Sequence, residues 1–373
     1  MKSRVAVVGI WISLVGSVLL PTTAFAATPA SSTNSGSGTN ITTSPVFTTL
    51  KVEPGKTVTT TLGVQNNALS PIGIQLELQT FKPYGTGGQA KISKPLPHSA
   101  FVSWVHFSQS SFIAEPNTWV HVQMTISPPP TAALDYYYAV LVKPVSPASL
   151  KLHTPTTTFT GYNAILTLLD VISPNAKPRL SVSNFSTNHG LYEYLPANFN
   201  VTVHNVGNIY LAPVGDIYIS RDSNFKKIIS TIPFNANQGN VIPGSSRVFT
   251  TQWTNGFPLF VPETVDGQPL VGGDGNPIER LTWNFSQANN FRFGRYYAKM
   301  VFVYNNGVTD VPTTAVLSFW VIPWKLGSAA VLIILLCMVG LYVSGHKVAD
   351  RAARLSNKAA RFSRLRVKKR RRE

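Results

Sequence analysis

The chain has 373 residues and a formal net charge of +17, from 32 Lys and Arg against 15 Asp and Glu. Twelve of these cations follow residue 346, so the region 27–323 is nearly balanced; this excludes the clustered cations that nucleic-acid binding requires, and we expect no nucleic-acid partner. Cys337 is the only cysteine, which excludes disulfides, thiolate metal sites and cysteine nucleophiles from the rest of the chain.

The N-terminus has the pattern of a secretory signal peptide over residues 1–26. Two cations precede an apolar stretch, and Ala24-Phe25-Ala26 is a small-residue cleavage site of the A-x-A kind. An uncleaved signal anchor is the alternative. Residues 27–44 are mostly Ser, Thr, Gly and Asn, so we expect a disordered leader there.

After the leader, short runs of Val, Ile, Thr, Tyr and Phe are broken by Pro, Gly and Asn. Residues 57–66 alternate with period two, and no stretch before the C-terminal apolar run keeps a 3.6-residue period. The sequence therefore predicts an all-β fold of two tandem immunoglobulin-like β-sandwich domains, then one transmembrane helix and a basic cytoplasmic tail. We place the first sandwich at 45–172, a linker at 173–179 and the second sandwich at 180–323.

An internal repeat supports this count of two domains. Each half contains a Val-x-Asn strand end, a Pro-Asn or Pro-Gly turn, and a Tyr-Tyr-Ala segment expected in a buried strand. The two sets are Val64 to Asn66, Pro116-Asn117 and Tyr137 to Ala139, and Val203 to Asn205, Pro243-Gly244 and Tyr296 to Ala298.

The second half carries an insertion at about 254–290 that is rich in Gly, Pro and Asp. A loop of this length is usually functional or disordered. We expect it to determine specificity and the sandwich to tolerate its deletion. Asp266-Gly267 is a strong signal for a hairpin turn. A calcium loop that includes Asp274 is the alternative, although Glu279 lies at the wrong interval to close the shell.

Residues that support catalysis are scarce. The sequence has no Gly-x-Ser-x-Gly elbow, no His-Glu-x-x-His helix and no phosphate-binding Gly loop. His106 and His121 lie mid-strand and could face each other across a sheet, but without a third ligand they make a weak metal site. We therefore predict a protein that is not an enzyme, with no catalytic, metal-binding or cofactor-binding residues and no cofactor.

Residues 326–345 form an uncharged apolar run of the length that crosses a bilayer as a helix. We expect Trp320, Trp324 and Lys325 at the external membrane interface. Because Lys and Arg stay on the cytoplasmic side, the tail 346–373 is predicted to be cytoplasmic, and the N-terminal region extracytoplasmic at the cell membrane.

The tail combines cations with an apolar repeat at Val348, Leu355 and Phe362, typical of a basic amphipathic helix on the inner leaflet. Anionic lipids are the predicted partners, and a docking helix for a cytoplasmic protein is the alternative. The predicted inner-leaflet contacts are Arg351, Arg354, Lys358, Arg361, Lys368, Lys369, Arg370, Arg371 and Arg372.

In the first predicted domain, Pro54-Gly55 precedes an alternating strand that ends in Val64-x-Asn66-Asn67. This segment resembles the first domain of the bacterial WxL-interacting surface proteins. That family has a signal peptide, two consecutive β-sandwiches, a membrane helix and a short basic tail, the same plan as this chain. The resemblance implies a peptidoglycan-binding first domain and a partner-binding second domain. FKPYGTGGQ stands where the family has an Asn-Gly-rich signature.

These features together predict a non-catalytic, single-pass cell-surface protein with a role in adhesion. It would bind a cell-wall polymer or another surface protein through its tandem immunoglobulin-like domains, with sheet edges able to accept a partner strand. The alternatives are an extracytoplasmic chaperone-like or assembly module, and an accessory subunit of a surface enzyme.

Overall fold

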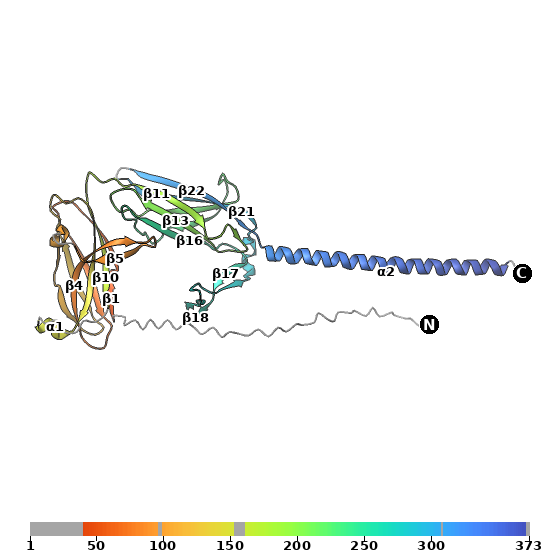
Figure 1. Ribbon diagram of the computed structural model, residues 1–373, viewed down its shortest axis with the longest axis horizontal. Helices are drawn as coiled ribbons and strands as arrows, with labels where there is room; N and C mark the ends of the chain where they lie inside the picture. Colours follow the sequence, from red (N-terminus) through yellow and green to blue (C-terminus); the bar gives the residue numbers. More distant parts are fainter. Residues whose placement is uncertain (1–39, 96–98, 153–160, 307–308, 371–373) are drawn as a thin grey trace. The chain divides into compact units, whose positions relative to one another are not determined.

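The computed structural model describes residues 40–95, 99–152, 161–306 and 309–370. Its strands form two β-sandwiches, and one long helix follows them (Figure 1). The fold is all-β, with immunoglobulin-like sandwiches and a C-terminal apolar helix, which confirms the predicted fold class. The predicted signal peptide lies outside the described residues.

The first sandwich consists of sheets with strand orders β1-β3-β8-β6 and β2-β10-β9-β4-β5, with β7 paired to β4. Val122, Met124 and Ile126 of β8 are fully buried between the sheets, because alternate side chains of a strand point to the same face. The elements are β1 (Ile41–Ser44), β2 (Phe47–Val52), β3 (Val58–Asn66), β4 (Ile72–Tyr84), β5 (Gln89–Ser93), η1 (Ala100–Trp104), β6 (Val105–Phe107), β7 (Ser111–Ala114), β8 (Trp119–Ile126), β9 (Leu134–Val145), α1 (Pro147–Leu152) and β10 (Asn163–Val171).

The first sandwich begins earlier than the composition indicated. Strand β1 pairs antiparallel with β3, with Ile41 opposite Asn66, and the side chains of Ile41 and Thr43 are buried. The predicted disordered leader 27–44 is therefore wrong for Ile41–Ser44, because these polar-looking residues alternate and cover the core. The part of the leader before residue 40 lies outside the described residues.

The second sandwich follows the predicted linker 173–179 and has strand orders β11-β13-β16 and β12-β22-β21-β14-β15. Aromatic rings dominate its core: Phe199 and Phe319 lie edge to face with centroids 5.6 Å apart. The elements are β11 (Leu180–Thr187), β12 (Leu191–Tyr192), β13 (Ala197–Asn205), β14 (Val214–Ser220), β15 (Ile228–Phe234), β16 (Ser246–Trp253), β17 (Leu259–Pro262), β18 (Thr264–Val265), β19 (Gln268–Pro269), β20 (Glu279–Thr282), η2 (Phe285–Asn290), β21 (Gly294–Asn305) and β22 (Asp310–Val321).

A buried asparagine ends the equivalent strand of each sandwich, β3 and β13. Each amide nitrogen donates to the carbonyl four residues on and to a distant carbonyl, while the amide oxygen accepts the N–H two residues on. For Asn66 the partners are Ser70 (2.8 Å), Ala114 (3.0 Å) and Ala68 (2.8 Å); for Asn205 they are Ile209 (2.8 Å), Val241 (2.7 Å) and Gly207 (2.9 Å). The Val-x-Asn repeat is confirmed, and its physical role is to satisfy buried backbone groups.

The Pro-Asn and Pro-Gly turns are equivalent as well. Asn117 N–H donates to Asn66 O at 2.7 Å, and Gly244 N–H donates to Asn205 O at 2.9 Å. Both turn residues have positive φ, 55° for Asn117 and 69° for Gly244, which explains why Asn and Gly occupy them. The predicted turns are confirmed.

The Tyr-Tyr-Ala segments lie in buried strands, β9 and β21, but they are out of register. Tyr138, the second tyrosine of its segment, points into the first core, whereas Tyr296, the first of its segment, points into the second core. A one-residue slip exchanges the two faces of a strand. The two Tyr-Tyr-Ala segments therefore do not occupy equivalent positions in the two sandwiches, and their shared sequence is a coincidence.

The insertion is only partly a loop. Phe260 N–H donates to Leu195 O at 2.9 Å, Phe257 N–H donates to Asn290 O at 3.0 Å, and Leu259 packs against the second core. Deletion of 254–290 would remove the contacts of Phe260 and Leu259 with the rest of the second sandwich. That the sandwich tolerates this deletion stays a prediction.

Residues 262–278, inside the insertion, belong to a separate compact unit. Strands β18 and β19 pair across Asp266-Gly267, whose φ angles are both positive at 52° and 77°. This is the geometry of a two-residue hairpin turn, and the hairpin prediction is confirmed. Asp274 accepts hydrogen bonds only from Asn276 among the described contacts, as a turn residue does.

Helix α2 runs from Trp324 to Arg370 without a break (Figure 1). Its segment Trp324–Val348 is long and apolar enough to cross a bilayer, the one such helix among the described residues. The predicted tail 346–373 continues this helix as far as Arg370.

Candidate functional site

The outer face of one sheet of the first sandwich is buried against the second sandwich. An apolar cluster from β4, β9 and β10 packs against Tyr210 and Ile242, which lie in loops of the second sandwich. The buried members of this cluster are Phe81, Ala139, Leu141 and Leu168. Because this face carries apolar side chains, its burial favours contact between the sandwiches.

Two backbone N–H groups of the second sandwich donate to the first. Tyr210 N–H donates to Asp135 Oδ2, and Val248 N–H donates to Thr86 O at 2.7 Å. Asp135 Oδ2 also accepts the hydroxyl of Tyr137 at 2.9 Å. Thr86 lies at the tip of the β4–β5 hairpin, so this hairpin reaches β16 and fixes one side of the junction.

Asp135 titrates at this junction. Burial raises the pKa of Asp135 to about 7, against the opposing effect of the hydrogen bonds from Tyr210 N–H and Tyr137 OH. Asp170, which lies opposite Asp135 on the adjacent strand β10, raises the pKa of Asp135 further and itself pairs with Lys51 at 3.6 Å. The charge at the junction therefore changes near neutral pH.

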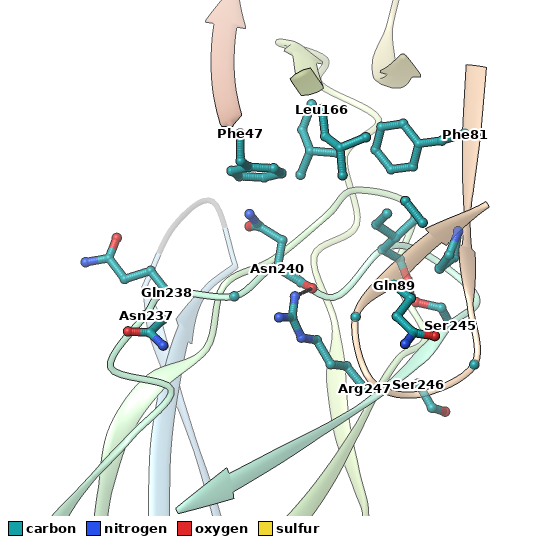
Figure 2. Close-up of a pocket in the computed structure, with 17 residues that line it drawn as sticks. Phe47, Phe81, Gln89, Leu166, Asn237, Gln238, Asn240, Ser245, Ser246 and Arg247 are labelled. Atoms are coloured by element: carbon teal, nitrogen blue, oxygen red, sulfur yellow. Dashed lines mark hydrogen bonds between the residues drawn. The ribbon is translucent and has the colours of Figure 1, made fainter. Parts of the chain in front are cut away.

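A cavity of about 290 Å³ lies between the two sandwiches beside these contacts (Figure 2); we call it the cleft. Figure 2 shows an apolar wall from the first sandwich and a polar wall mainly from the loop between β15 and β16. The apolar wall consists of Phe47, Phe81, Leu166 and Leu168; the polar wall consists of Gln89, Asn237, Gln238, Asn240, Ser245, Ser246 and Arg247. Phe47 is 43% exposed, so the apolar wall is open to a ligand.

Arg247 is the one charged residue among the described residues that line the cleft. Its Nη1 donates to Asn240 O at 2.9 Å, and its Cζ lies 5.3 Å from the centroid of the Phe249 ring. Burial lowers the pKa of Arg247, yet a guanidinium stays charged in proteins. None of the ion pairs between described residues includes Arg247, which leaves its charge available to an anion.

Two glycines make room for this guanidinium. A Cβ at Gly88 would lie 2.6 Å from Arg247 Cζ, and a Cβ at Gly239 would lie 2.7 Å from it. Gly88 belongs to the first sandwich and Gly239 to the second, so the guanidinium lies against the backbone of both. Its position therefore depends on how the two sandwiches meet.

The loop that carries the amides is held by its own hydrogen bonds. Asn235 Nδ2 donates to Pro213 O at 2.7 Å and to Gly239 O at 3.0 Å, while Asn235 Oδ1 accepts Gly239 N–H at 2.7 Å. Asn235 and Gln238 have positive φ, 52° and 49°. The backbone of this loop is thus held in place before any ligand arrives, which reduces the entropy lost on binding.

One serine–histidine contact borders the cleft. His204 Nδ1 lies 3.0 Å from Ser246 Oγ, across the pair of strands β13 and β16. No carboxylate contacts His204 in the described part of the chain, so the third member of a catalytic triad is missing there. Within the same residues, no three His, Cys, Asp or Glu side chains gather as metal ligands do.

The predicted histidine pair does not form. His106 on β6 lies opposite Thr125 of β8. His121, four residues earlier on β8, lies opposite Gly63 of β3. The ring of His121 stacks with that of Trp119, with centroids 6.4 Å apart. The two rings therefore do not face each other, because β6 pairs only with the far end of β8.

The predicted interface residues lie where the second sandwich meets α2. Trp320 is 45% and Trp324 56% exposed, and Lys325 Nζ pairs with Glu193 Oε2 at 2.7 Å. The tail cations from Arg351 to Arg370 lie on α2, while Arg371 and Arg372 lie outside the described residues. Their contact with lipid stays a prediction.

The cleft is not predicted by any pattern in the sequence. Its residues come from strands and loops far apart in the chain, and Arg247 is a single cation with no motif around it. One signal was present: Tyr136 to Val142 is an unbroken apolar run, which indicates a strand buried on both faces and hence a second layer against the sheet.

No protein-family profile and no curated protein matches this chain. Among solved structures it is similar to the class 5 fimbriae chaperone CfaA, with 16% identity, 74% of this chain and 98% of that chain covered, and a TM-score of 0.34. It is also similar to a chain of the CsuC–CsuE chaperone–tip subunit complex of Acinetobacter baumannii, with 10% identity, 74% and 97% coverage, and a TM-score of 0.31. A PapD-like domain of human CEP192 matches 36% of this chain over 87% of its own length, with 16% identity and a TM-score of 0.25.

Proposed function

We propose that this chain is a non-catalytic, single-pass membrane protein that binds a cell-wall polymer in the cleft between its two sandwiches. The observation that carries the proposal is Arg247, a charged side chain that forms no ion pair with any described residue and lies between an apolar wall and a wall of amides. Binding sites commonly combine an apolar surface with a few placed polar groups in this way.

The ligand chemistry that fits best is a saccharide with a carboxylate. A sugar ring offers an apolar face, which can pack on Phe47, and hydroxyl groups, which suit the amides of Asn237 and Asn240. The planar guanidinium of Arg247 suits a carboxylate, because its N–H groups form paired hydrogen bonds with two oxygens. At about 290 Å³ the cleft is at the small end of ligand sites, so it would hold a short segment of the polymer.

Helix α2 supplies the anchor in this proposal. Its apolar segment is long enough to cross the membrane, and the cation-rich residues that follow would keep the C-terminal end in the cytoplasm. Both sandwiches would then face the cell wall. Protease added to intact cells should cleave at the sandwiches and spare the tail; protection of the sandwiches would reverse the proposed orientation.

A binding assay with insoluble cell wall tests the ligand. Full-length protein in detergent should sediment with purified wall, and Arg247→Ala should weaken this binding by about tenfold, the equivalent of about 1.4 kcal/mol. Lys226→Ala, which removes an exposed cation outside the cleft, is the matched control. Equal binding by Arg247→Ala and the control would contradict the proposal.

A chaperone-like or assembly role is the second candidate. Strand β2 lies at the edge of its sheet, and Phe47 at its start also lines the cleft. An extended segment of a client protein could add to such an edge and place a side chain in the cleft. Crosslinking from the β2 edge would then capture secreted proteins instead of wall polymer.

A further inference from the structure

The end of the second sandwich next to α2 carries exposed aromatic side chains that the core does not use. Phe285 is 74% exposed, Phe293 55%, and Trp283 and Phe291 44% each. We call these four residues the aromatic end. Large apolar side chains in one exposed group mark a surface that contacts something other than water.

Two of these side chains, Trp283 and Phe285, pack on each other and on Phe257. Phe257 lies beneath, with its ring centroid 5.7 Å from that of Trp283 and 5.5 Å from that of Phe285. The rings of Trp283 and Phe285 are stacked at 6.4 Å. A bridge joins Phe257 to Phe291, and the Asn284 side chain caps η2 by accepting Ser286 N–H. The aromatic end is therefore held on a formed surface.

Strand register places this group beside the start of α2. Gly294, the residue after Phe293, lies opposite Val321, and Val321 precedes Trp324 by three positions. At about 3.3 Å per residue, Phe293 lies within roughly 10 Å of the level at which α2 begins. The cleft lies at the other end of this sandwich, where β13 ends and β16 starts.

Cations surround the aromatic end. Arg221 Nη2 donates to Phe293 O at 2.8 Å, Arg292 Nε donates to Asn255 O at 2.8 Å, and Arg295 lies opposite Trp320. None of the ion pairs between described residues involves these three arginines. Exposed aromatic rings among unpaired cations are the side chains that favour the headgroup region of a bilayer.

We infer that the aromatic end binds the surface of the lipid bilayer, with its rings at the boundary of headgroups and acyl chains and its arginines on anionic phosphates. The inference rests on the spanning α2 of the proposed function. Each cation near an anionic surface favours this contact, and the exposed rings are removed from water. The second sandwich would then be fixed against the membrane at two places, α2 and the aromatic end, which orients the cleft toward the wall.

Spin labels at single cysteines test the inference in the full-length chain. The background is Cys337→Ser, and the chain is reconstituted in vesicles of phosphatidylcholine and phosphatidylglycerol. Phe285→Cys reports the aromatic end, Leu69→Cys reports an exposed loop of the first sandwich, and Val339→Cys reports α2. The measurement is the accessibility of each nitroxide to oxygen, which concentrates in lipid, and to a water-soluble nickel complex.

The label at residue 285 should show a several-fold higher oxygen-to-nickel ratio than the label at residue 69. A ratio at residue 285 equal to that at residue 69, with residue 339 still in lipid, would overturn the inference and leave the spanning helix intact. A label at residue 339 in water would overturn both. A label at residue 285 that is shielded from both reagents, in vesicles and in micelles alike, would indicate a protein contact and also overturn the inference.

Discussion

The two sandwiches share an arrangement of strands, turns and buried asparagines, which we call the frame. They differ in what lies outside it. Both end the same strand with a buried asparagine, both make the same turn, and both pair an N-terminal strand in parallel with the last strand of the sheet. In the first sandwich, however, β9 is buried on both faces, whereas its counterpart β21 alternates between buried and more exposed residues. The frame therefore maintains each fold, and the second face of β9 is used to join the sandwiches.

In the proposals above, the cleft at the junction binds the ligand and the aromatic end binds the membrane. A strand buried on both faces cannot offer a free surface, so the first sandwich presents its cleft wall through Phe47 and the β4–β5 hairpin. The second sandwich contributes the amide loop at one end and the aromatic end at the other. Substitutions in the frame should thus affect stability, and substitutions at the junction should affect binding.

The largest expected effect is on the frame. Asn205→Ala removes three hydrogen bonds and leaves buried carbonyls without a donor, so it should destabilise the second sandwich by about 3 kcal/mol. Hydrogen exchange of the full-length protein should show faster exchange in β13 and β21. Asn184→Ala, at an exposed position of the same sandwich, is the control and should change stability by less than about 0.5 kcal/mol. Slow exchange retained in Asn205→Ala would show that the asparagine is not needed.

The next effect concerns pH. The pKa of Asp135 is raised by folding from 3.8 to about 7, so the folded chain holds a proton that the unfolded chain releases. The contribution of Asp135 to stability is therefore full below about pH 4 and is lost as the pH rises to 7. Asp135→Asn should flatten the dependence of the melting temperature on pH in this window.

Asp222→Asn is a suitable comparison for that experiment. Backbone N–H groups lower the pKa of Asp222, so its contribution has the opposite sign and is lost only as the pH falls through that lowered pKa. It should leave the slope between pH 4 and 7 in place. A slope that survives in Asp135→Asn would mean that other groups titrate at the junction.

The smallest effect tests how Arg247 is positioned. Gly88→Ala places a Cβ against the guanidinium and strains a residue with φ of 79°, which costs roughly 1 kcal/mol. Gly275→Ala has the same kind of strain, with φ of 80°, but it lies outside the cleft and its Cβ meets no atom within 4 Å. Both should lower stability slightly, and Gly88→Ala alone should add a loss of wall binding through Arg247. Equal binding by the two variants would show that the cleft tolerates movement of Arg247.

Much of the frame could be predicted from the sequence because its signals are local. Period-two alternation identified the strands, and Val-x-Asn with a following Pro pair identified the repeat at Asn66 and Asn205. That His106 and His121 do not face each other could not be read from the sequence, because strand register depends on partners distant in sequence. The cleft could not be predicted from the sequence. The position of the Arg247 side chain depends on Gly88 and Gly239, which belong to different sandwiches and come together only in the folded chain.

Hydrogen exchange in the presence of a wall ligand tests the central claim most directly. Full-length protein in detergent would be compared with and without soluble wall fragments. We predict added protection in two separate segments, 81–90 of the first sandwich and 235–247 of the second, because both line the cleft. Protection confined to 262–278, or none in either cleft segment while the protein is bound, would contradict the proposal that the cleft binds the polymer.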